Sequence, residues 1–418
     1  MSIGYACLTV GVPNTDQRSC VMRNASEEKL TELIQYNLNS LDRIIDYNIQ
    51  NDIKLFRISS DIIPFASNTV NTMPWWDLFD HQLKDIGRKI IDSQMRVSMH
   101  PGQYTVLNSP DEAVVSRAIA DLQYHTQFLD SLGVGSECKI ILHIGGVYQE
   151  KEKATLRFIE NYQKLSGSIK ARLVIENDDK SYNIADVLAI SEKAEIPVIY
   201  DNLHNAVNPK DIVTSDSYWI IESSHTWKEK DGRQKIHYSQ QNLEKHKGAH
   251  SEFIRINEFM EFFHDVKGNN IDIMLEVKDK NLSAVKCINA TACDKKISAL
   301  ELEWSKYKYK ILEKSPEDYN KIRQLLRDKK EYPAAEFYNL VEDALQKDSN
   351  TGYQVNAVQH VWGYFKFKAS EKEKTNLWKK LDAFTCGEIP YQTVKNILWK
   401  LTVKYQETYL LNSYYFVL

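Results

Sequence analysis

The chain has 418 residues, of which 43% are hydrophobic and 26% are charged, a composition typical of a folded globular protein and not of a disordered or fibrous one. This length accommodates one large α/β domain and a smaller second domain. The formal net charge of −4 excludes a surface that is basic throughout, but it leaves room for a local basic or metal-lined groove.

The cysteines and the N-terminus bear on the cellular compartment. Six cysteines are scattered without a CxxC pair, which indicates reduced thiols and not a disulfide framework or a structural zinc site. The first residues lack a basic segment before their apolar run, and no apolar stretch approaches the roughly 20 residues that a membrane span needs. We expect a monomeric, cytoplasmic protein without a membrane segment.

Short apolar runs alternate with helical patterns over the first 280 residues, and eight of them have the length and composition of buried strands. These runs cover residues 3–8, 54–59, 95–100, 139–144, 172–176, 197–201, 234–238 and 271–277. Between the first two, Leu30, Leu33, Leu38 and Leu41 have the spacing of a helix packed on a sheet. Eight such units predict the α/β class and a closed (β/α)8 TIM barrel.

The composition changes after about residue 300, where Lys, Glu, Tyr and Trp dominate. Helix starts become explicit there: Ser315 precedes Pro316 and Glu317, and the segment from Ser370 to Glu373 has the form of a capping box. The sequence therefore predicts a C-terminal all-α domain. We expect a barrel over residues 1–300, a helical connector over 301–330 and a small helical domain over 331–418.

Residues of metal-binding types stand at the ends of the predicted strands. In a (β/α)8 barrel the functional groups project from the C-terminal strand ends, and six of the eight runs end on or near a histidine or an acid. His204 follows the sixth run closely, and His250 opens a helical pattern that would bury Phe253, Ile256, Met260 and Phe263. The expected metal ligands are His100, His143, Glu176, Asp201, His204, His237, His250 and Glu276.

These eight residues indicate a multinuclear metal site. Buried ionisable groups are costly unless they are paired or bind a cation, so six such strand ends favour a common site over unrelated core residues. Imidazoles and carboxylates without thiolates suit Mn²⁺, Zn²⁺ or Fe²⁺, and the number of ligands implies two or three ions. Such a site suits hydrolysis of a phosphodiester. A sugar isomerase or epimerase of the same barrel class is the alternative, and a non-enzymatic binding protein with a decayed site is a third hypothesis.

The sequence resembles the UV damage endonucleases, barrel enzymes related in fold to endonuclease IV. The resemblance extends over most of the first 300 residues in matching order. The motifs that carry it are GYAC at 4–7, FRISSDIIPF at 56–65, HPGQY at 100–104, LHIGG at 142–146, ENDD at 176–179, DNLHN at 201–205, KIHYSQQ at 235–241, GAHSEFI at 248–254 and LEVKDKN at 275–281.

The resemblance implies a DNA repair enzyme and a manganese cluster held by the eight residues above. Such an enzyme nicks damaged double-stranded DNA on the 5′ side of cyclobutane pyrimidine dimers, 6-4 photoproducts and other lesions, which starts excision repair. Glu176, Glu276 and Lys235 would be catalytic. Lys235 matches a lysine that is carboxylated in the family, and the alternative is an ordinary phosphate-binding or rim lysine.

The resemblance also assigns residues to the lesion. Gln103 and Tyr104 match a pair that the family inserts into the duplex at the damage, and Tyr5 and Asn68 are expected to contact DNA nearby. Asn68 replaces a histidine of many relatives, which puts one metal position or backbone contact in question, and Thr9 departs from an asparagine found in some. For Arg57 we expect an ion pair with a carboxylate inside the barrel mouth.

The C-terminal part resembles a widespread small helical domain of unknown function, through VNAVQHVWGYFKFK at 355–368, EIPY at 388–391 and YLLNSYYF at 409–416. His360, Trp362, Tyr364 and the tyrosine cluster are most simply core residues at helical spacing. The alternative is an aromatic surface for single-stranded nucleic acid.

Overall fold

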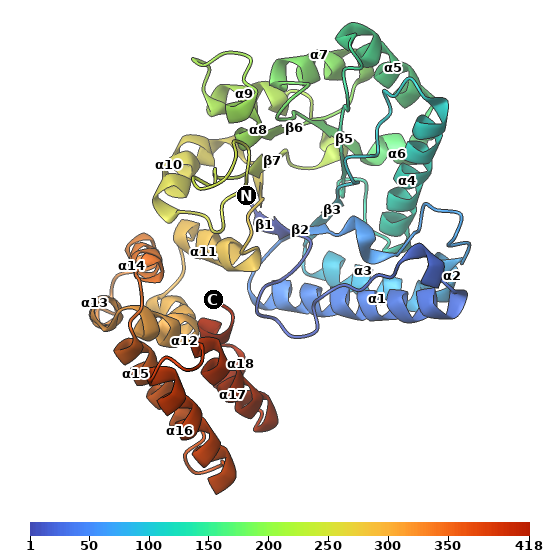
Figure 1. Ribbon diagram of the computed structural model, residues 1–418. Coiled ribbons are helices and arrows are strands. Elements are labelled where there is room, and N and C mark those ends of the chain that lie inside the picture. Colours follow the sequence, from blue (N-terminus) through green and yellow to red (C-terminus); the bar gives the residue numbers. More distant parts are fainter. The chain divides into compact units, whose positions relative to one another are not determined.

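The first 288 residues build a closed barrel of parallel strands. The computed structural model describes residues 1–418, and its strands follow the order β1-β2-β3-β4-β5-β6-β7-β8 around the ring (Figure 1). Every neighbouring pair is parallel, and β1 closes the ring by pairing with β8. The predicted (β/α)8 fold is confirmed.

Each strand lies within one of the eight apolar runs identified in the sequence. The strands are β1 Ile3–Ala6, β2 Leu55–Ile58, β3 Arg96–Met99, β4 Ile140–His143, β5 Leu173–Glu176, β6 Val198–Asp201, β7 Lys235–Tyr238 and β8 Asp272–Leu275. Almost all of their residues are buried, because one face of each strand fills the barrel and the other is covered by helices. This two-sided burial explains why the runs are continuously apolar and do not alternate.

Helices surround the barrel and connect its strands. They are α1 Glu27–Gln50, α2 Trp75–Leu78, α3 Asp80–Asp92, α4 Glu112–Ser131, α5 Lys151–Lys164, α6 Gly167–Arg172, α7 Ile184–Ala194, α8 Asn202–Val207, α9 Asp216–Ser224, α10 Ile256–Val266 and α11 Asn281–Thr291. The expected first helix is confirmed: the Ser26 side chain caps α1, and Leu30, Leu33, Leu38 and Leu41 are buried on its inner face.

The strand register brings the polar strand ends to one edge of the sheet. His143 of β4 pairs with Glu176 of β5, and Asp201 of β6 pairs with His237 of β7. Glu276 directly follows β8, whose last residue, Leu275, pairs with Tyr238. The expected ligands from these strands therefore share the C-terminal mouth of the barrel.

The chain divides into two compact units. The barrel unit comprises residues 1–9, 13–254 and 261–288, and the helical unit comprises residues 10–12, 255–260 and 289–418. The helices of the C-terminal part are α12 Ile297–Lys314, α13 Pro316–Leu325, α14 Ala334–Gln346, α15 Thr351–Trp362, α16 Glu371–Thr385, α17 Tyr391–Lys404 and α18 Thr408–Leu411.

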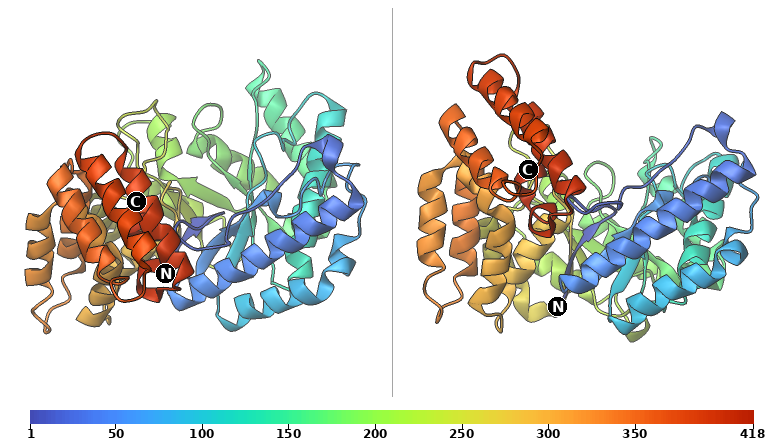
Figure 2. Two further views of the ribbon diagram at one scale, coloured as in Figure 1. Left: turned by 60° about the horizontal axis from the view of Figure 1, so that its bottom comes forward. Right: turned by 90° about the horizontal axis from the view of Figure 1, so that it is seen from below.

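The helical unit has its own hydrophobic core. Buried residues of α15, α16 and α17 pack together there with Leu312 of α12 and Tyr415, and α17 contacts both α15 and α16; this part of the chain is orange to red in Figure 2. Ser315 caps α13 ahead of Pro316, and Ser370 and Glu373 form the predicted capping box of α16. The predicted all-α character of this part is confirmed.

Two further expectations concern the cysteines and the membrane. All six cysteines are free thiols. None of the helices is both long enough and apolar enough to cross a membrane.

Candidate metal centre

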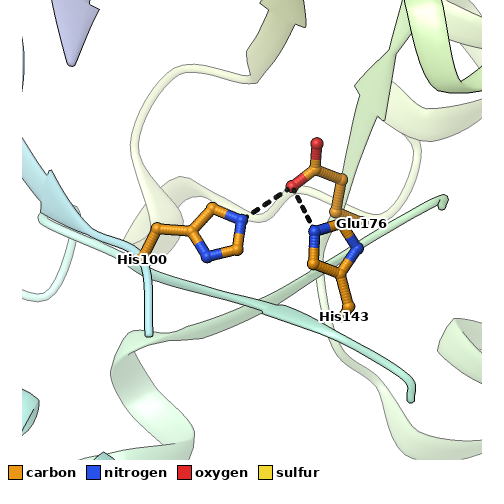
Figure 3. Close-up of side chains that lie close together, drawn as sticks. All are labelled: His100, His143 and Glu176. Atoms are coloured by element: carbon orange, nitrogen blue, oxygen red, sulfur yellow. Dashed lines mark ion pairs between the residues drawn. The ribbon is translucent and has the colours of Figure 1, made fainter. Parts of the chain in front are cut away.

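The structure brings the eight expected ligands together at the C-terminal mouth of the barrel. Glu176, at the end of β5, is the central residue and is almost completely buried. Its Oε2 lies 3.3 Å from Nε2 of His100 and 3.9 Å from Nε2 of His143 (Figure 3). These three side chains offer ligand atoms close enough together to hold one metal ion.

The other carboxylate oxygen of Glu176 faces β6 and β7. Its Oε1 lies 2.7 Å from Nδ1 of His237 and 3.6 Å from Nδ1 of His204. Asp201, on the neighbouring strand end, lies 3.8 Å from the same nitrogen of His204. Glu176, Asp201 and His237 form a second group that could hold a metal ion, so Glu176 belongs to both groups.

Glu276 extends the cluster toward His250. Oε1 of Glu276 lies 3.4 Å from Nδ1 of His237, and its Oε2 lies 3.8 Å from Nε2 of His250. Arg57 at the barrel mouth contacts the same carboxylate, with 2.5 Å between Nη1 and Oε1. The expected ion pair of Arg57 with a carboxylate inside the barrel mouth is confirmed.

The expected helical setting of His250 is wrong. His250 forms an isolated antiparallel bridge with Gln241, and α10 begins only at Ile256. Within that helix Ile256 and Phe259 are buried, whereas Phe263 is only partly buried. The apolar residues before Ile256 belong to an extended loop, and their spacing imitated the first turn of a helix.

Backbone carbonyls orient two of the imidazoles. His100 donates Nδ1–H to the carbonyl of Pro101 over 3.0 Å, and His204 donates Nδ1–H to the carbonyl of Asn177 over 2.9 Å. In the neutral imidazole, each bond keeps the proton on Nδ1 and leaves Nε2 free, as metal-binding histidines require.

Several buried polar atoms of the cluster have no hydrogen-bond partner. They are Nδ1 of His143, Oδ2 of Asp201, Nε2 of His237 and Nζ of Lys235. Such atoms cost free energy when they are withdrawn from water without a partner. A divalent cation beside Glu176, Asp201 and His237 would satisfy the free carboxylate oxygen of Asp201, so the residues present fit a metal centre.

Burial and the neighbouring charges shift the pKa values of the cluster strongly. Burial lowers the pKa of His143 to about 4 and raises that of Asp201 to about 6. Against the effect of burial, the carboxylates of Asp201 and Glu176 raise the pKa of His204 to about 9. Burial opposes ionisation of Glu176 as well, but His237 and its neighbours hold the pKa of Glu176 well below its usual range.

Lys235 lies deeper in the barrel than the histidines. It is the first residue of β7, two residues before His237, and its side chain is fully buried. Burial lowers the pKa of Lys235 well below its ordinary value. A fully buried lysine is not at the rim of the barrel, and the structure gives its Nζ no hydrogen-bond partner.

Two loops beside this cluster hold three of the four expected lesion-contacting residues: Gln103, Tyr104 and Asn68. Gln103 and Tyr104 are exposed in the turn after β3, and the Tyr104 side chain is 71% exposed. A cavity of about 910 Å³ adjoins them, and its lining includes Tyr104, Asn68, Ser60 and Arg117. Asn68 accepts a hydrogen bond from the backbone N–H of Val70 through its Oδ1.

Tyr5 is placed elsewhere. It is fully buried within β1, its hydroxyl donates to Oδ1 of Asn48 over 2.8 Å, and its ring packs against Phe56. Tyr5 therefore points away from the barrel interior into the helix layer and does not reach the cavity. Thr9 is hydrogen-bonded to Thr15 in the loop after β1.

Helix α4 carries residues that sequence reasoning did not find. Asp121 is buried, and its carboxylate accepts hydrogen bonds from Ser67 over 2.9 Å and from Thr105 over 2.6 Å. One carboxylate thus joins the loop of Asn68 to the loop of Tyr104. One turn further along, the Tyr124 hydroxyl donates to the carbonyl of Ser60 over 2.8 Å. The spacing i, i+3 on an inward helix face was the available signal.

The closed barrel and the buried cluster at its mouth define a barrel enzyme with a candidate metal centre. Comparison with known families identifies the group: residues 1–305 match the model of the UV-endonuclease UvdE family, and residues 308–418 match a domain described as a protein of unknown function (DUF1722). The chain belongs to the UvdE family of UV endonucleases.

Individual relatives agree with this assignment. A UV DNA damage endonuclease of Clostridium perfringens is 40% identical over 413 residues, covering 97% of this chain and 96% of the relative. One from Bacillus cereus is 35% identical over 283 residues, covering 66% of this chain and 89% of the relative. The crystal structure of SacUVDE superimposes with a TM-score of 0.66 at 40% identity, covering 69% of this chain and 97% of that one. By its family the protein is a DNA repair endonuclease.

Proposed function

We propose that this enzyme uses a cluster of two or three divalent cations, with Mn²⁺ as the preferred ion, to hydrolyse the phosphodiester on the 5′ side of UV photoproducts. The substrates would be cyclobutane pyrimidine dimers, 6-4 photoproducts and other lesions in double-stranded DNA, and the nick would start excision repair. The observation that carries the proposal is the convergence of eight histidines and carboxylates around Glu176, with buried ligand atoms that lack partners.

The expected ligands fall into groups around Glu176 and Glu276. Glu176 would be shared between one ion near His100 and His143 and another near Asp201 and His237. Glu276, His204 and His250 would complete the cluster. When bound, divalent ions supply an activated water and stabilise the charge that develops on the scissile phosphate.

The protein itself would position and neutralise the acidic groups. Arg57 holds Glu276 through its guanidinium and adds positive charge beside the cluster. His100 donates its Nδ1–H to the carbonyl of Pro101, and His204 donates its Nδ1–H to the carbonyl of Asn177. Nε2 of each histidine therefore faces the centre. This fixed arrangement needs no reorganisation when the phosphate arrives.

Gln103 and Tyr104 would recognise the damage. A photoproduct stacks and pairs poorly, so its extrusion costs less than that of normal bases, and an exposed tyrosine with an amide neighbour can fill the gap. The exposure of both side chains and the place of Tyr104 in the lining of the cavity support this role. Asn68 would contact the DNA backbone from the adjoining loop.

We include carboxylation of Lys235 in the proposal. Burial lowers the pKa of Lys235 and so favours its neutral amine, and a neutral amine adds CO₂ to give a carbamate and one proton. Lys235 has the burial and the lack of partners that this reaction needs. Incorporation of ¹³C-bicarbonate should give a carbamate NMR signal that is absent from Lys235→Met.

The deciding experiment uses an end-labelled duplex with a single thymine dimer. With Mn²⁺ the enzyme should nick directly 5′ of the dimer, leave the undamaged duplex intact, and lose this activity in Glu176→Gln. Nicking of an abasic duplex alone would instead indicate an abasic-site endonuclease, and inactivity on every duplex would contradict the proposal.

A double variant separates recognition from chemistry. Gln103→Ala with Tyr104→Ala should lose the preference for damaged duplex while the manganese content of the purified protein stays unchanged. If the preference survives, these two residues do not recognise the lesion.

A further inference from the structure

Two consecutive helices of the helical unit each carry an aromatic residue followed four positions later by a cationic residue. Trp304 and Lys308 lie one turn apart on α12, and Tyr319 and Arg323 lie one turn apart on α13. The two aromatic rings meet, with 5.2 Å between the centroids of Trp304 and Tyr319. Each helix thus presents one ring and one cation on the same side.

Two further tyrosines continue this surface. Tyr364 follows α15, Tyr409 belongs to α18, and their rings stack with centroids 5.5 Å apart and planes inclined by 18°. Lys308 connects the two parts, because its Nζ lies 4.5 Å from the centroid of the Tyr409 ring. We call this set the aromatic patch: Trp304, Lys308, Tyr319, Arg323, Tyr364 and Tyr409.

The aromatic rings of the patch are not fully covered. All four aromatic side chains are half-buried, so part of each ring is open to solvent. Trp362, one of the residues expected as core, is by contrast buried in the hydrophobic core of this unit. Tyr319, Tyr364 and Tyr409 also pack against that core, so each has one side on the core and only part of its surface on the patch.

The cations of the patch lack the acidic partners that their neighbours have. The adjacent lysines form ion pairs: Lys306 with Glu303, Lys310 with Glu313, and Lys321 with Glu317. Lys308 and Arg323 contact aromatic rings instead and form no ion pair. Burial and the charge of Arg323 both lower the pKa of Lys308, which places two like charges close together without an acid between them.

We propose that the aromatic patch binds single-stranded DNA, with backbone phosphates at Lys308 and Arg323 and bases stacked on the open rings. Two neighbouring cations without acidic partners favour an anion, and stacking rings beside them match the alternation of phosphate and base in a single strand. In a duplex the base faces are already stacked on one another, so a duplex would leave the rings unused. This binding goes beyond the proposed nicking activity and gives the helical unit a separate function.

The test measures binding of the full-length protein to a fluorescent twelve-residue thymidine oligonucleotide by anisotropy, with chelator present so that nothing is cleaved. The variant Lys308→Gln with Arg323→Gln should bind at least about tenfold more weakly. Since a single strand contributes a slope of about −0.7 per phosphate contact, loss of two contacts should reduce the slope of log K against log salt by about 1.4.

The matched control removes the same charge from another face. Lys372 and Lys379 are exposed on α16, and Lys372→Gln with Lys379→Gln should leave both the affinity and the salt slope unchanged. If the two double variants weaken binding equally, the effect is one of net charge and the proposal is overturned.

The rings are tested separately from the charges. Trp304→Leu should weaken oligonucleotide binding several-fold without changing the salt slope, and Tyr319→Leu gives the same test if the first variant unfolds by circular dichroism. An abasic oligonucleotide of equal length should bind more weakly than oligothymidine. Equal binding of the two would indicate a phosphate site without base stacking and would overturn the proposal, whereas nicking of a dimer-containing duplex should be normal in all these variants.

Discussion

The two ends of the barrel both bury charged side chains but satisfy them differently. At the N-terminal end Lys139 lies 2.5 Å from Oδ1 of Asp231 and donates to the carbonyl of Ala171 over 2.8 Å. Asp272 in turn accepts hydrogen bonds from the Ser2 backbone over 2.8 Å and from Arg233 over 3.0 Å. At the C-terminal mouth, Asp201 and His237 each keep one buried atom without a partner.

The difference distinguishes structural charges from functional ones. A buried ion pair with all of its hydrogen bonds made is complete within the protein, so removing one member leaves the other uncompensated. A cluster in which imidazoles share the carboxylates and several atoms stay unpaired is complete only when cations join it. The ion pairs of Lys139 and Asp272 therefore support the fold, whereas the mouth is built for a ligand.

The largest effect is expected from Glu176→Gln at the mouth. This change removes the charge that both ligand groups share, so nicking of dimer-containing DNA should fall by at least about 10³-fold, the upper end for loss of one stabilising group in an active site. Urea unfolding of the metal-free variant should be near that of the parent. A variant that retains activity would show that the cluster does not depend on its central acid.

The opposite result is expected from Asp231→Ala at the N-terminal end. This change leaves Lys139 buried without its counter-charge and should lower the free energy of unfolding by about 3–5 kcal/mol, as measured by urea titration. Manganese content per folded molecule should stay unchanged. If Asp231→Ala lost manganese but kept its stability, the distinction between a structural N-terminal end and a ligand-binding mouth would be wrong.

The pH dependence of metal binding should sharpen the comparison further. His204, with its pKa near 9, carries a proton at neutral pH and must lose it to bind a cation, whereas Asp201, with its pKa near 6, becomes protonated below that pH. Affinity for Mn²⁺ should therefore rise with pH between 6 and 9, by about tenfold per unit for one released proton.

Calorimetry in two buffers of different ionisation enthalpy measures that proton directly. His204→Gln is the matched control, because it should bind more weakly but release no proton in this range. An affinity that is constant from pH 6 to pH 9 would contradict the prediction.

The smallest effect concerns Asp121, which joins the two loops above the mouth. Asp121→Leu removes both hydrogen bonds and should reduce the preference for damaged over undamaged duplex by about 30-fold, at about 1 kcal/mol per hydrogen bond. Asp121→Asn should retain most of the preference, because the hydroxyls of Ser67 and Thr105 can either donate or accept. Manganese content should be the same in both variants, and an unchanged preference in the leucine variant would rule out this role.

Sequence reasoning located the fold and the mouth well because both leave local signals. The buried strands are continuous apolar runs, and a histidine or an acid at the end of such a run is unusual enough to be noticed at His143 or Glu176. The structure brings all eight expected side chains together. Their role as ligands stays a prediction, as do the contacts of Gln103 and Tyr104 with DNA.

Other features depend on tertiary contacts that the sequence does not display. The partners of Asp121 stand 54 and 16 residues away, so their hydrogen bonds could not be inferred from spacing. For Tyr5 the difficulty is different: both faces of a barrel strand are apolar, and the pattern does not reveal which residues point inward. His250 was assigned to a helix because a few apolar residues matched its period by chance.

The hydrogen bonds of Asp121 also show which residues of the two loops could be substituted without detaching the loops from α4. Thr105 and Ser67 attach the loops to α4, whereas Gln103, Tyr104 and Asn68 are exposed next to these attachment points. The three exposed positions could therefore be randomised together, while the hydroxyls of Ser67 and Thr105 that attach the loops are kept. If these exposed residues contact the lesion as proposed, such libraries would change which lesions the enzyme accepts and leave the metal cluster untouched.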